Sequence, residues 1–582
     1  MKKIYYTLTI GIALFLGLST GCKKANSFLD SQSTNDLDET TVFADSARTS
    51  AFLLGIYSRV AFQSDPVEVN SLGAPFAAAT DEAESRWPGG QNVPIQMFQG
   101  SFGTAFTKSN NDDWSFLYTG IRMANIYLKN ADNAPLSANL KAKSKLEARF
   151  LRAYFYHFLL KFYGGVQLVG DEVKGLAAPN TDPRSSYEAC VNYVVGELDA
   201  VAAQLPLTNQ GLDYGRVTKG AALALKARVL LSAASPLFNG GSLATDAAVI
   251  PLTAYPNADA SRWQKAMDAS KAVMDLNQYQ LVEDNATRPG NGFYKMFLDR
   301  ANSEAIFQRM LGNNKLFEGN WLPPTRGGSF LIYPSQQLVD AFPMKNGKLK
   351  GEAGSGFDAA NPYANRDPRL DYTVIYNGAM YFDGRVNAMA PVYTYVGAAQ
   401  DGIQAATANT ATNTGYYCRK MCDELVYGNS TANTQRCQPL IRYAEILLNY
   451  AEAANESGQT NTALNQLIAL RKRAGINAGT DSRYGIPASM TQDNARLLIQ
   501  NERFIELAFE EQRYFDLRRW KLGAEYDGKF LKGMRITKTG NTYTYAEINV
   551  RTPRYFKVNS YLFPIPTAEI SINREVKQNP GW

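Results

Sequence analysis

Residues 441–520 constrain the fold most strongly, because they predict consecutive amphipathic helices joined by short turns. The apolar positions of the first helix recur at helical spacing: Ala444, Leu447, Leu448, Ala451 and Ala454. Ser457 and Gly458 predict its end, and Gly475 occupies the place expected just beyond the next helix. A third helix is expected through residues 497–520. This pattern is typical of helical hairpins of the tetratricopeptide kind, although no strict repeat is present.

The third of these helices is unusually rich in charge. Its charged residues are Glu502, Arg503, Glu506, Glu510, Glu511, Arg513, Asp516, Arg518 and Arg519. Glu502, Glu506 and Glu510 repeat a like charge at i,i+4, so they would repel one another unless arginines from elsewhere meet them. An acid/base site is one interpretation. We favour a structural ion-pair network, because charged helix faces are usually solvated or paired.

Three segments together resemble the C-terminal signature of a known family. They are RYAEILLNYAEAANE (442–456), NERFIELAFEEQRYFDLRRW (501–520) and LFPIPTAEISINREVKQNPGW (562–582). They resemble the SusD/RagB family, outer-membrane lipoproteins of Bacteroidetes that bind nutrients for a TonB-dependent transporter. The resemblance implies a mainly α fold, in which a tetratricopeptide-like helical scaffold carries a loop-rich insertion and few short β-strands.

The start of the chain has the features of an export signal. Lys2 and Lys3 precede an apolar run at residues 8–18, and small residues lead to Cys22. This predicts a signal peptide at residues 1–21 with a lipidated Cys22, although Ser19 departs from the usual lipobox, and an ordinary cleaved secreted protein is the alternative. The run is too short to span a bilayer, which needs about 20 residues. The polar residues 22–50 would tether the protein to the outer membrane, and surface exposure rests on the resemblance alone.

The remainder divides into two parts that we expect to pack as one globule. Residues 51–280 predict a helical part, with helices at residues 46–61, 113–130, 141–163, 185–204 and 218–234 and another from Trp263. Residues 281–582 form the C-terminal part, in which 323–440 predict a loop-dominated insertion with short hairpins. Strands are predicted only at residues 304–310, 372–376 and 555–563.

Composition and residue inventory exclude several classes of function. The net charge of +6 falls to +4 when residues 1–21 are removed, since they carry two lysines and no acid. So small a net positive charge argues against nucleic acid as a partner. His157 is the single histidine and lies in an aromatic-rich helix, so a multi-histidine metal site is excluded. No nucleotide-binding or nucleophilic-hydrolase motif is present, and no cofactor is expected. The pairing of Cys190, Cys418, Cys422 and Cys437 does not follow from the sequence, so a disulfide stays open.

Exposed aromatic rings with a polar rim are what a glycan site requires. Four tryptophans are expected to be structural: Trp114, Trp263, Trp520 and Trp582. Trp87 and Trp321 differ, because both lie in segments rich in Gly, Pro and Asn. They match by region and residue type the aromatic arc of the family's sugar-binding members. The expected polar rim consists of Arg86, Asn92, Gln96, Tyr294 and Asn320.

The expected function is therefore non-catalytic binding of an oligosaccharide and its delivery to a TonB-dependent transporter of the SusC kind. A peptide-binding member of the same family is one alternative. A glycoside hydrolase is another, since paired carboxylates need no histidine. A third and simpler alternative is a helical scaffold that binds only other proteins.

Overall fold

The computed structural model describes residues 38–61, 76–86, 96–97, 103, 113–173, 181–404, 410–431 and 435–582. The predicted signal peptide and Cys22 lie outside the described residues. Mainly helical structure with short strands confirms the predicted fold class.

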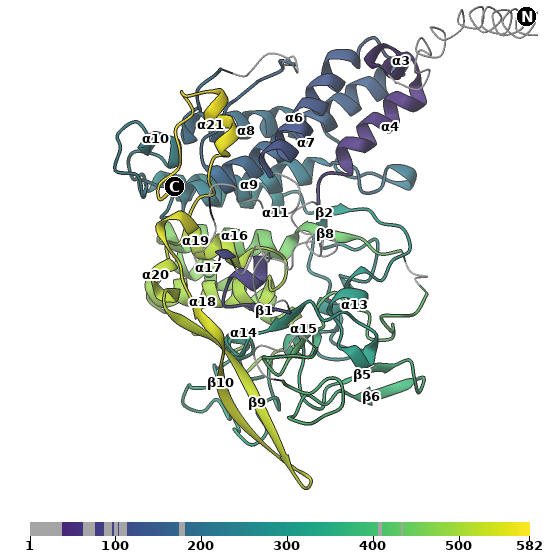
Figure 1. Ribbon diagram of the computed structural model, residues 1–582, viewed down its shortest axis with the longest axis vertical. Coiled ribbons are helices and arrows are strands. Elements are labelled where there is room, and N and C mark those ends of the chain that lie inside the picture. Colours follow the sequence, from purple (N-terminus) through teal and green to yellow (C-terminus); the bar gives the residue numbers. More distant parts are fainter. Residues whose placement is uncertain are drawn as a thin grey trace, which may run out of the picture.

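Helices of the first half form one layer of the molecule (Figure 1). They are α3 (Glu39–Phe43), α4 (Ser46–Tyr57), α6 (Asp113–Asn130), α7 (Ala138–Tyr163), α8 (Tyr187–Ala202), α9 (Lys219–Ala234), α10 (Ile250–Thr253) and α11 (Ser261–Met274). Side-chain oxygens of Ser137, Ser186 and Thr218 cap α7, α8 and α9 and fix where these helices begin. The predicted helices are confirmed, with ends displaced by a few residues.

A second helical group lies directly against this layer, because α11 packs on α16. It comprises α16 (Tyr443–Glu456), α17 (Thr460–Arg473), α18 (Gln492–Glu506), α19 (Arg513–Arg519) and α20 (Gly523–Tyr526), and the separate α21 (Thr567–Ile572) lies beside the N-terminal layer. Gly458 and Gly475 adopt positive φ and end α16 and α17 as predicted. The prediction of one helix through 497–520 is wrong. Phe509 and Glu511, with φ of 60° and 61°, break it into α18 and α19.

The strands are short and pair only in twos among the described residues. The antiparallel pairs are β1 (Ala83–Ser85) with β3 (Ile332–Pro334), β2 (Ala305–Arg309) with β8 (Gln438–Arg442), β4 (Val374–Ile375) with β7 (Tyr417–Cys418), β5 (Met380–Asp383) with β6 (Ala388–Pro391), and β9 (Lys529–Thr539) with β10 (Thr542–Arg554). Short helices lie between them: α12 (Asn291–Lys295), α13 (Leu316–Trp321), α14 (Gln336–Ala341) and α15 (Arg369–Thr373). The 3₁₀ turns are η2 (Phe76–Ala79), η3 (Gly211–Asp213), η4 (Pro324–Arg326) and η5 (Val558–Ser560).

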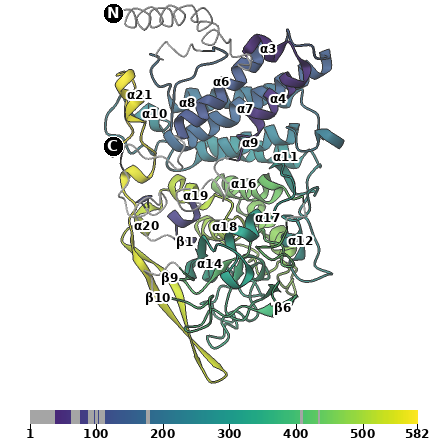
Figure 2. The ribbon, with the colours of Figure 1, turned by 45° about the vertical axis from the view of Figure 1, so that its right-hand side comes forward.

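The β9–β10 hairpin projects from the body on the side away from the N-terminal layer (Figures 1 and 2). Sequence reasoning missed it and placed a strand at residues 555–563, where the chain instead forms a turn and η5. The prediction at 372–376 is also largely wrong, since α15 extends to Thr373 and β4 contains only two residues. Within residues 372–376 only Val374 and Ile375 pair with another strand, β7, and residues 555–563 pair with none of the described strands.

The core draws on both ends of the chain. Phe162 of α7 contacts Phe515 of α19 and Phe563, with ring centroids 5.6 and 5.0 Å apart. His157, which also lies on α7, is buried, as expected for a packed histidine. All four described cysteines are buried free thiols, so no disulfide joins them. No described helix has the length and apolarity that crossing a bilayer would require.

Candidate ligand-binding site

The loop that carries Trp87 begins at the end of β1. Ser85 pairs with Ile332 of β3, and the Arg86 N–H then donates to the carbonyl of Leu331 at 2.8 Å. Trp87 and Asn92 lie outside the described residues. Gln96 is described together with Met97 only, and Met97 is buried in the core.

Arg86 lies flat on an aromatic ring at the root of this loop. Its guanidinium is 4.1 Å from the centroid of the Phe330 ring, and its Nη1 donates to the Ser329 carbonyl at 3.0 Å. Arg551 donates from Nη2 to the Arg86 carbonyl at 3.0 Å and from Nη1 to Glu84 at 3.1 Å. The backbone and side chain of Arg86 are therefore fixed from both sides, and its side chain is only partly buried.

Two residues that brace Arg86 adopt backbone conformations uncommon for side chains of their size. Phe330 has a φ of 42° and Arg551 a φ of 51°. Such conformations cost on the order of 1–3 kcal/mol each and persist where the surrounding structure imposes them. Strain of this kind concentrates at ligand sites, which favours the loop root as a functional position.

The structure brings Asn320 close to Arg86. The Leu331 N–H donates to the Asn320 carbonyl at 2.9 Å, while the Leu331 carbonyl accepts from Arg86. The Asn320 side chain also donates to the Leu316 carbonyl at 2.6 Å within α13. Asn320 therefore belongs to the same braced region as Arg86, joined to it through one residue of backbone.

Trp321 does not offer an exposed ring, so the prediction that it forms a platform is wrong. Only 2% of it is exposed, and its ring packs against Phe317 and Phe509 with centroids 4.8 and 5.8 Å apart. The reason is that LFEGNW forms α13 rather than a loop, which places Phe317 and Trp321 at i,i+4 on the inward face. That spacing was visible in the sequence and is the signal that reasoning from the loop composition passed over.

Tyr294 of α12 lies in a separate aromatic group. Its ring stacks on Tyr372 with centroids 5.5 Å apart, and the Arg288 guanidinium faces both rings. Its hydroxyl donates to the Asp423 carboxylate at 3.3 Å and accepts from the Glu424 N–H at 2.9 Å. Both hydrogen-bonding functions of this hydroxyl already have protein partners, so its ring face is what it can offer to a ligand.

A group of surface tyrosines was missed by sequence reasoning. Tyr393, Tyr395 and Tyr543, which we call the tyrosine face, have successive ring centroids 5.8 Å apart. Tyr393 is 42% exposed, and the Lys538 ammonium lies 5.1 Å from the Tyr395 ring. The sequence signal is the alternation in VYTYV (392–396) and TYTY (542–545), because residues two apart share one face of an extended segment. Partly exposed tyrosines present flat apolar surface with a polar edge, as sugar rings require.

The carboxylates of α18 form a structural network, as the sequence predicted. Arg369, Arg442 and Arg473 come from other segments and contact Glu506, and Lys420 pairs with Glu510 at 2.7 Å. Burial alone would raise the pKa of Glu506, but the three arginines outweigh it and hold that pKa well below its ordinary value. A general acid of a glycoside hydrolase needs a raised pKa, whereas the pKa of Glu506 is lowered. No group of metal-ligating side chains occurs among the described residues.

Two family models match the sequence. One, described as the SusD family, matches residues 293–582. The other, described as starch-binding and associating with the outer membrane, matches residues 27–231. Together they cover most of both halves of the chain.

Individual relatives agree with these matches. SusD-like protein P2 of Formosa agariphila is 35% identical over 144 residues, which is 24% of this chain and 25% of that protein. The chain is thus matched over only a quarter of this relative's length. A SusD-like protein from Bacteroides fragilis superimposes with a TM-score of 0.76 at 24% identity, covering 94% of this chain and 99% of that one. A structure described as a SusD-like carbohydrate-binding protein from the same species gives 0.72 at 24% identity, covering 92% and 100%. At these identities the structural likeness shows the fold.

Proposed function

The chain belongs to the SusD family, and we propose that it binds an oligosaccharide without cleaving it and delivers it to a TonB-dependent transporter of the SusC kind. The protein would be held at the outer membrane, exposed at the cell surface, by lipid on Cys22. The description of a matching family model as starch-binding and associating with the outer membrane supports the ligand class and the outer-membrane location. The carbohydrate-binding description of a structural relative supports the ligand class.

The observation that carries the proposed binding site is the braced position of Arg86. This residue immediately precedes Trp87, and its guanidinium lies over Phe330 while keeping part of its surface accessible. We infer that the Trp87 ring stacks on a sugar, and that Arg86, its neighbour in the sequence, and Asn320 supply hydrogen bonds to the hydroxyls. The backbone of Arg86 is already held by Leu331 and Arg551. Binding of a ligand therefore requires little further ordering of Arg86.

The tyrosine face is the second surface on which a glycan could rest. Its rings are spaced by 5.8 Å, and Tyr393 and Tyr395 are held to β9 by the Val396 N–H, which donates to the Ile536 carbonyl at 2.9 Å. It lacks a fixed arginine like Arg86, so we place the principal contact at Trp87.

Calorimetric titration of the purified protein against a panel of oligosaccharides and peptides tests the proposal. We expect saturable binding of a glycan without shortened products. Trp87→Ala should weaken it about fivefold or more, since stacking on one aromatic side chain contributes about 1 kcal/mol. Tyr555→Ala, which removes another exposed aromatic ring, is the control and should bind like the wild type.

Each other outcome corrects a different part of the proposal. Loss of binding in Tyr395→Ala but not in Trp87→Ala would move the site to the tyrosine face and keep the function. Binding of peptides alone would replace the ligand class. Release of shortened products by the pure protein would overturn the non-catalytic assignment.

A further inference from the structure

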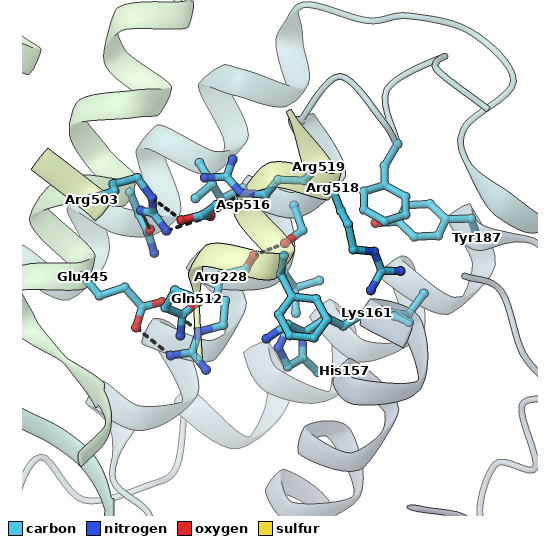
Figure 3. Close-up of a pocket in the computed structure, with 17 residues that line it drawn as sticks. His157, Lys161, Tyr187, Arg228, Glu445, Arg503, Gln512, Asp516, Arg518 and Arg519 are labelled. Carbon is cyan, nitrogen blue, oxygen red and sulfur yellow. Dashed lines mark hydrogen bonds and ion pairs between the residues drawn. The ribbon is translucent and has the colours of Figure 1, made fainter. Parts of the chain in front are cut away.

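A small cavity lies where the N-terminal layer meets the second helical group. Its volume is about 40 Å³, and α7, α9, α16, α18 and α19 all contribute to its walls (Figure 3). A second cavity of about 30 Å³ shares Lys161, Arg228, Glu445 and Gln512 with it. One water molecule needs roughly 10–15 Å³ of cavity volume, so each cavity has room for only two or three water molecules.

Basic side chains outnumber carboxylates in the walls. The basic side chains are Lys161, Arg228, Arg503, Arg518 and Arg519, and the carboxylates are Glu445 and Asp516. Burial, together with the nearby Arg228, lowers the pKa of Lys161 well below its ordinary value, so a bound anion would favour its protonated form. Arg228 pairs with Glu445 at 2.6 Å. Arg503 and Arg519 share Asp516 at 3.1 and 2.8 Å. Within the described part of the chain, Lys161 and Arg518 are the wall cations that make no ion pair with a carboxylate.

Arg518 is a buried charge with little compensation. It is 2% exposed, and its one hydrogen bond among the described residues runs from Nη2 to the Phe162 carbonyl at 3.5 Å. Its Nε and Nη1 have no protein partner. Burial lowers the pKa of Arg518 to about 10, which still leaves it protonated at neutral pH. An unpaired buried charge costs several kcal/mol, so a compensating group is expected here.

Lys161 and His157 line the same cavity from α7. The Lys161 ammonium lies 3.6 Å from the centroid of the Phe515 ring, and the Arg518 guanidinium lies 5.3 Å from it, so both cations gather around one ring. The His157 Nε2 atom is buried without a protein partner. In Figure 3 the Arg518 side chain extends from α19 toward the helix that carries Lys161 and His157. Buried nitrogen atoms without a protein partner among the described residues therefore line this cavity from both α7 and α19.

We propose that this cavity binds a small inorganic anion, chloride, between Lys161 and Arg518. The limited volume favours a monatomic anion over phosphate or an organic acid. The two wall carboxylates do not oppose it strongly, because arginines neutralise both of them. The bound anion would compensate the charge that packing of α19 against α7 buries, and so it would stabilise the junction between the two helical groups. This site is independent of the glycan site proposed above.

The test compares halide with a larger anion. Melting temperatures of the full mature protein are measured at equal ionic strength in sodium chloride, sodium bromide and sodium gluconate. We expect a saturable rise in Tm with chloride and bromide over gluconate, because a ligand that binds only the folded state stabilises it. Crystals soaked in bromide should show an anomalous peak within contact distance of the Lys161 Nζ and Arg518 atoms.

Lys161→Met should remove the halide-specific rise in Tm, with Arg518→Met as a second variant. Lys226→Met is the matched control, since it changes the net charge equally at a partly buried lysine outside the cavity that pairs with Asp199, and it should keep the full halide response. Equal Tm in halide and gluconate for the wild type, or a soaked crystal without an anomalous peak in the cavity, would overturn the proposal and indicate a cavity filled by water. A halide response unchanged in Lys161→Met would overturn it too.

Discussion

Glu82 is a buried carboxyl group next to β1, four residues before the partly buried Arg86. It accepts a hydrogen bond from the Phe509 N–H, and Phe509 in turn packs on Trp321. Burial raises the pKa of Glu82 to about 8, and the nearby Glu511 and Asp81 add to the rise, while the Phe509 N–H and Lys420 oppose it. The neutral form is thus the one that this position favours.

We predict that Glu82→Gln makes stability less dependent on pH. Between about pH 4.5 and pH 8 the unfolded chain has lost the Glu82 proton while the folded chain keeps it, so the wild type loses stability as pH rises. Glutamine retains an acceptor for Phe509 and does not titrate. The Tm of the variant minus that of the wild type should therefore increase between about pH 5 and pH 8. An equal difference at both pH values would contradict the assignment.

At the scale of elements, the carboxylate at the end of α18 is paired with arginines from distant segments of the chain. Arg442, at the end of β8, donates to Glu304, Glu506 and Glu510 over 2.7–2.8 Å and is 1% exposed. Its interactions tie β2, β8 and the end of α18 into one unit. Removing Arg442 takes one cation from each of these three buried carboxylates, which, among the residues that the structure describes, then depend on Arg369, Arg473 and Lys420 alone.

We predict that Arg442→Met lowers the free energy of unfolding by about 3–5 kcal/mol, the usual cost of breaking a buried ion pair by removing one partner. Arg496→Met is the matched control. Arg496 also pairs with a carboxylate, Glu456, but it is 36% exposed, so its loss should cost less than about 1 kcal/mol. Urea unfolding followed by circular dichroism measures both. Similar losses for the two variants would mean that the α18 network contributes little.

At the scale of the whole molecule, the proposed function requires the folded body to be attached to the outer membrane. The predicted lipid on Cys22 is the attachment, and several acyl chains on one cysteine would hold the protein firmly, at about 0.8 kcal/mol per buried CH₂.

We predict that Cys22→Ser moves the protein from the membrane fraction to the soluble fraction of fractionated cells. Cys437→Ser, which alters a thiol buried within the folded body, should leave the distribution unchanged. Membrane association that persists in Cys22→Ser would show that another contact holds the protein there.

Local sequence pattern is sufficient to predict the helical framework. Helical periodicity and capping residues act over a few positions, so the ranges of α6, α7, α9 and α16 follow from local pattern. The same local reasoning showed that the carboxylates of α18 need arginines from elsewhere. It could have found the tyrosine face and the β9–β10 hairpin, whose alternation is visible along 529–554.

Which of these residues meet depends on how the elements pack. The spacing of Phe317 and Trp321 indicates that the two rings share a helix face, but not that Phe509, 188 positions away, covers it. The arginines that pair with Glu506 and the convergence of Arg518 on Lys161 likewise join segments far apart in the chain. Long-range contacts are set by packing of whole elements, and a sequence pattern specifies an element's face but not what covers it.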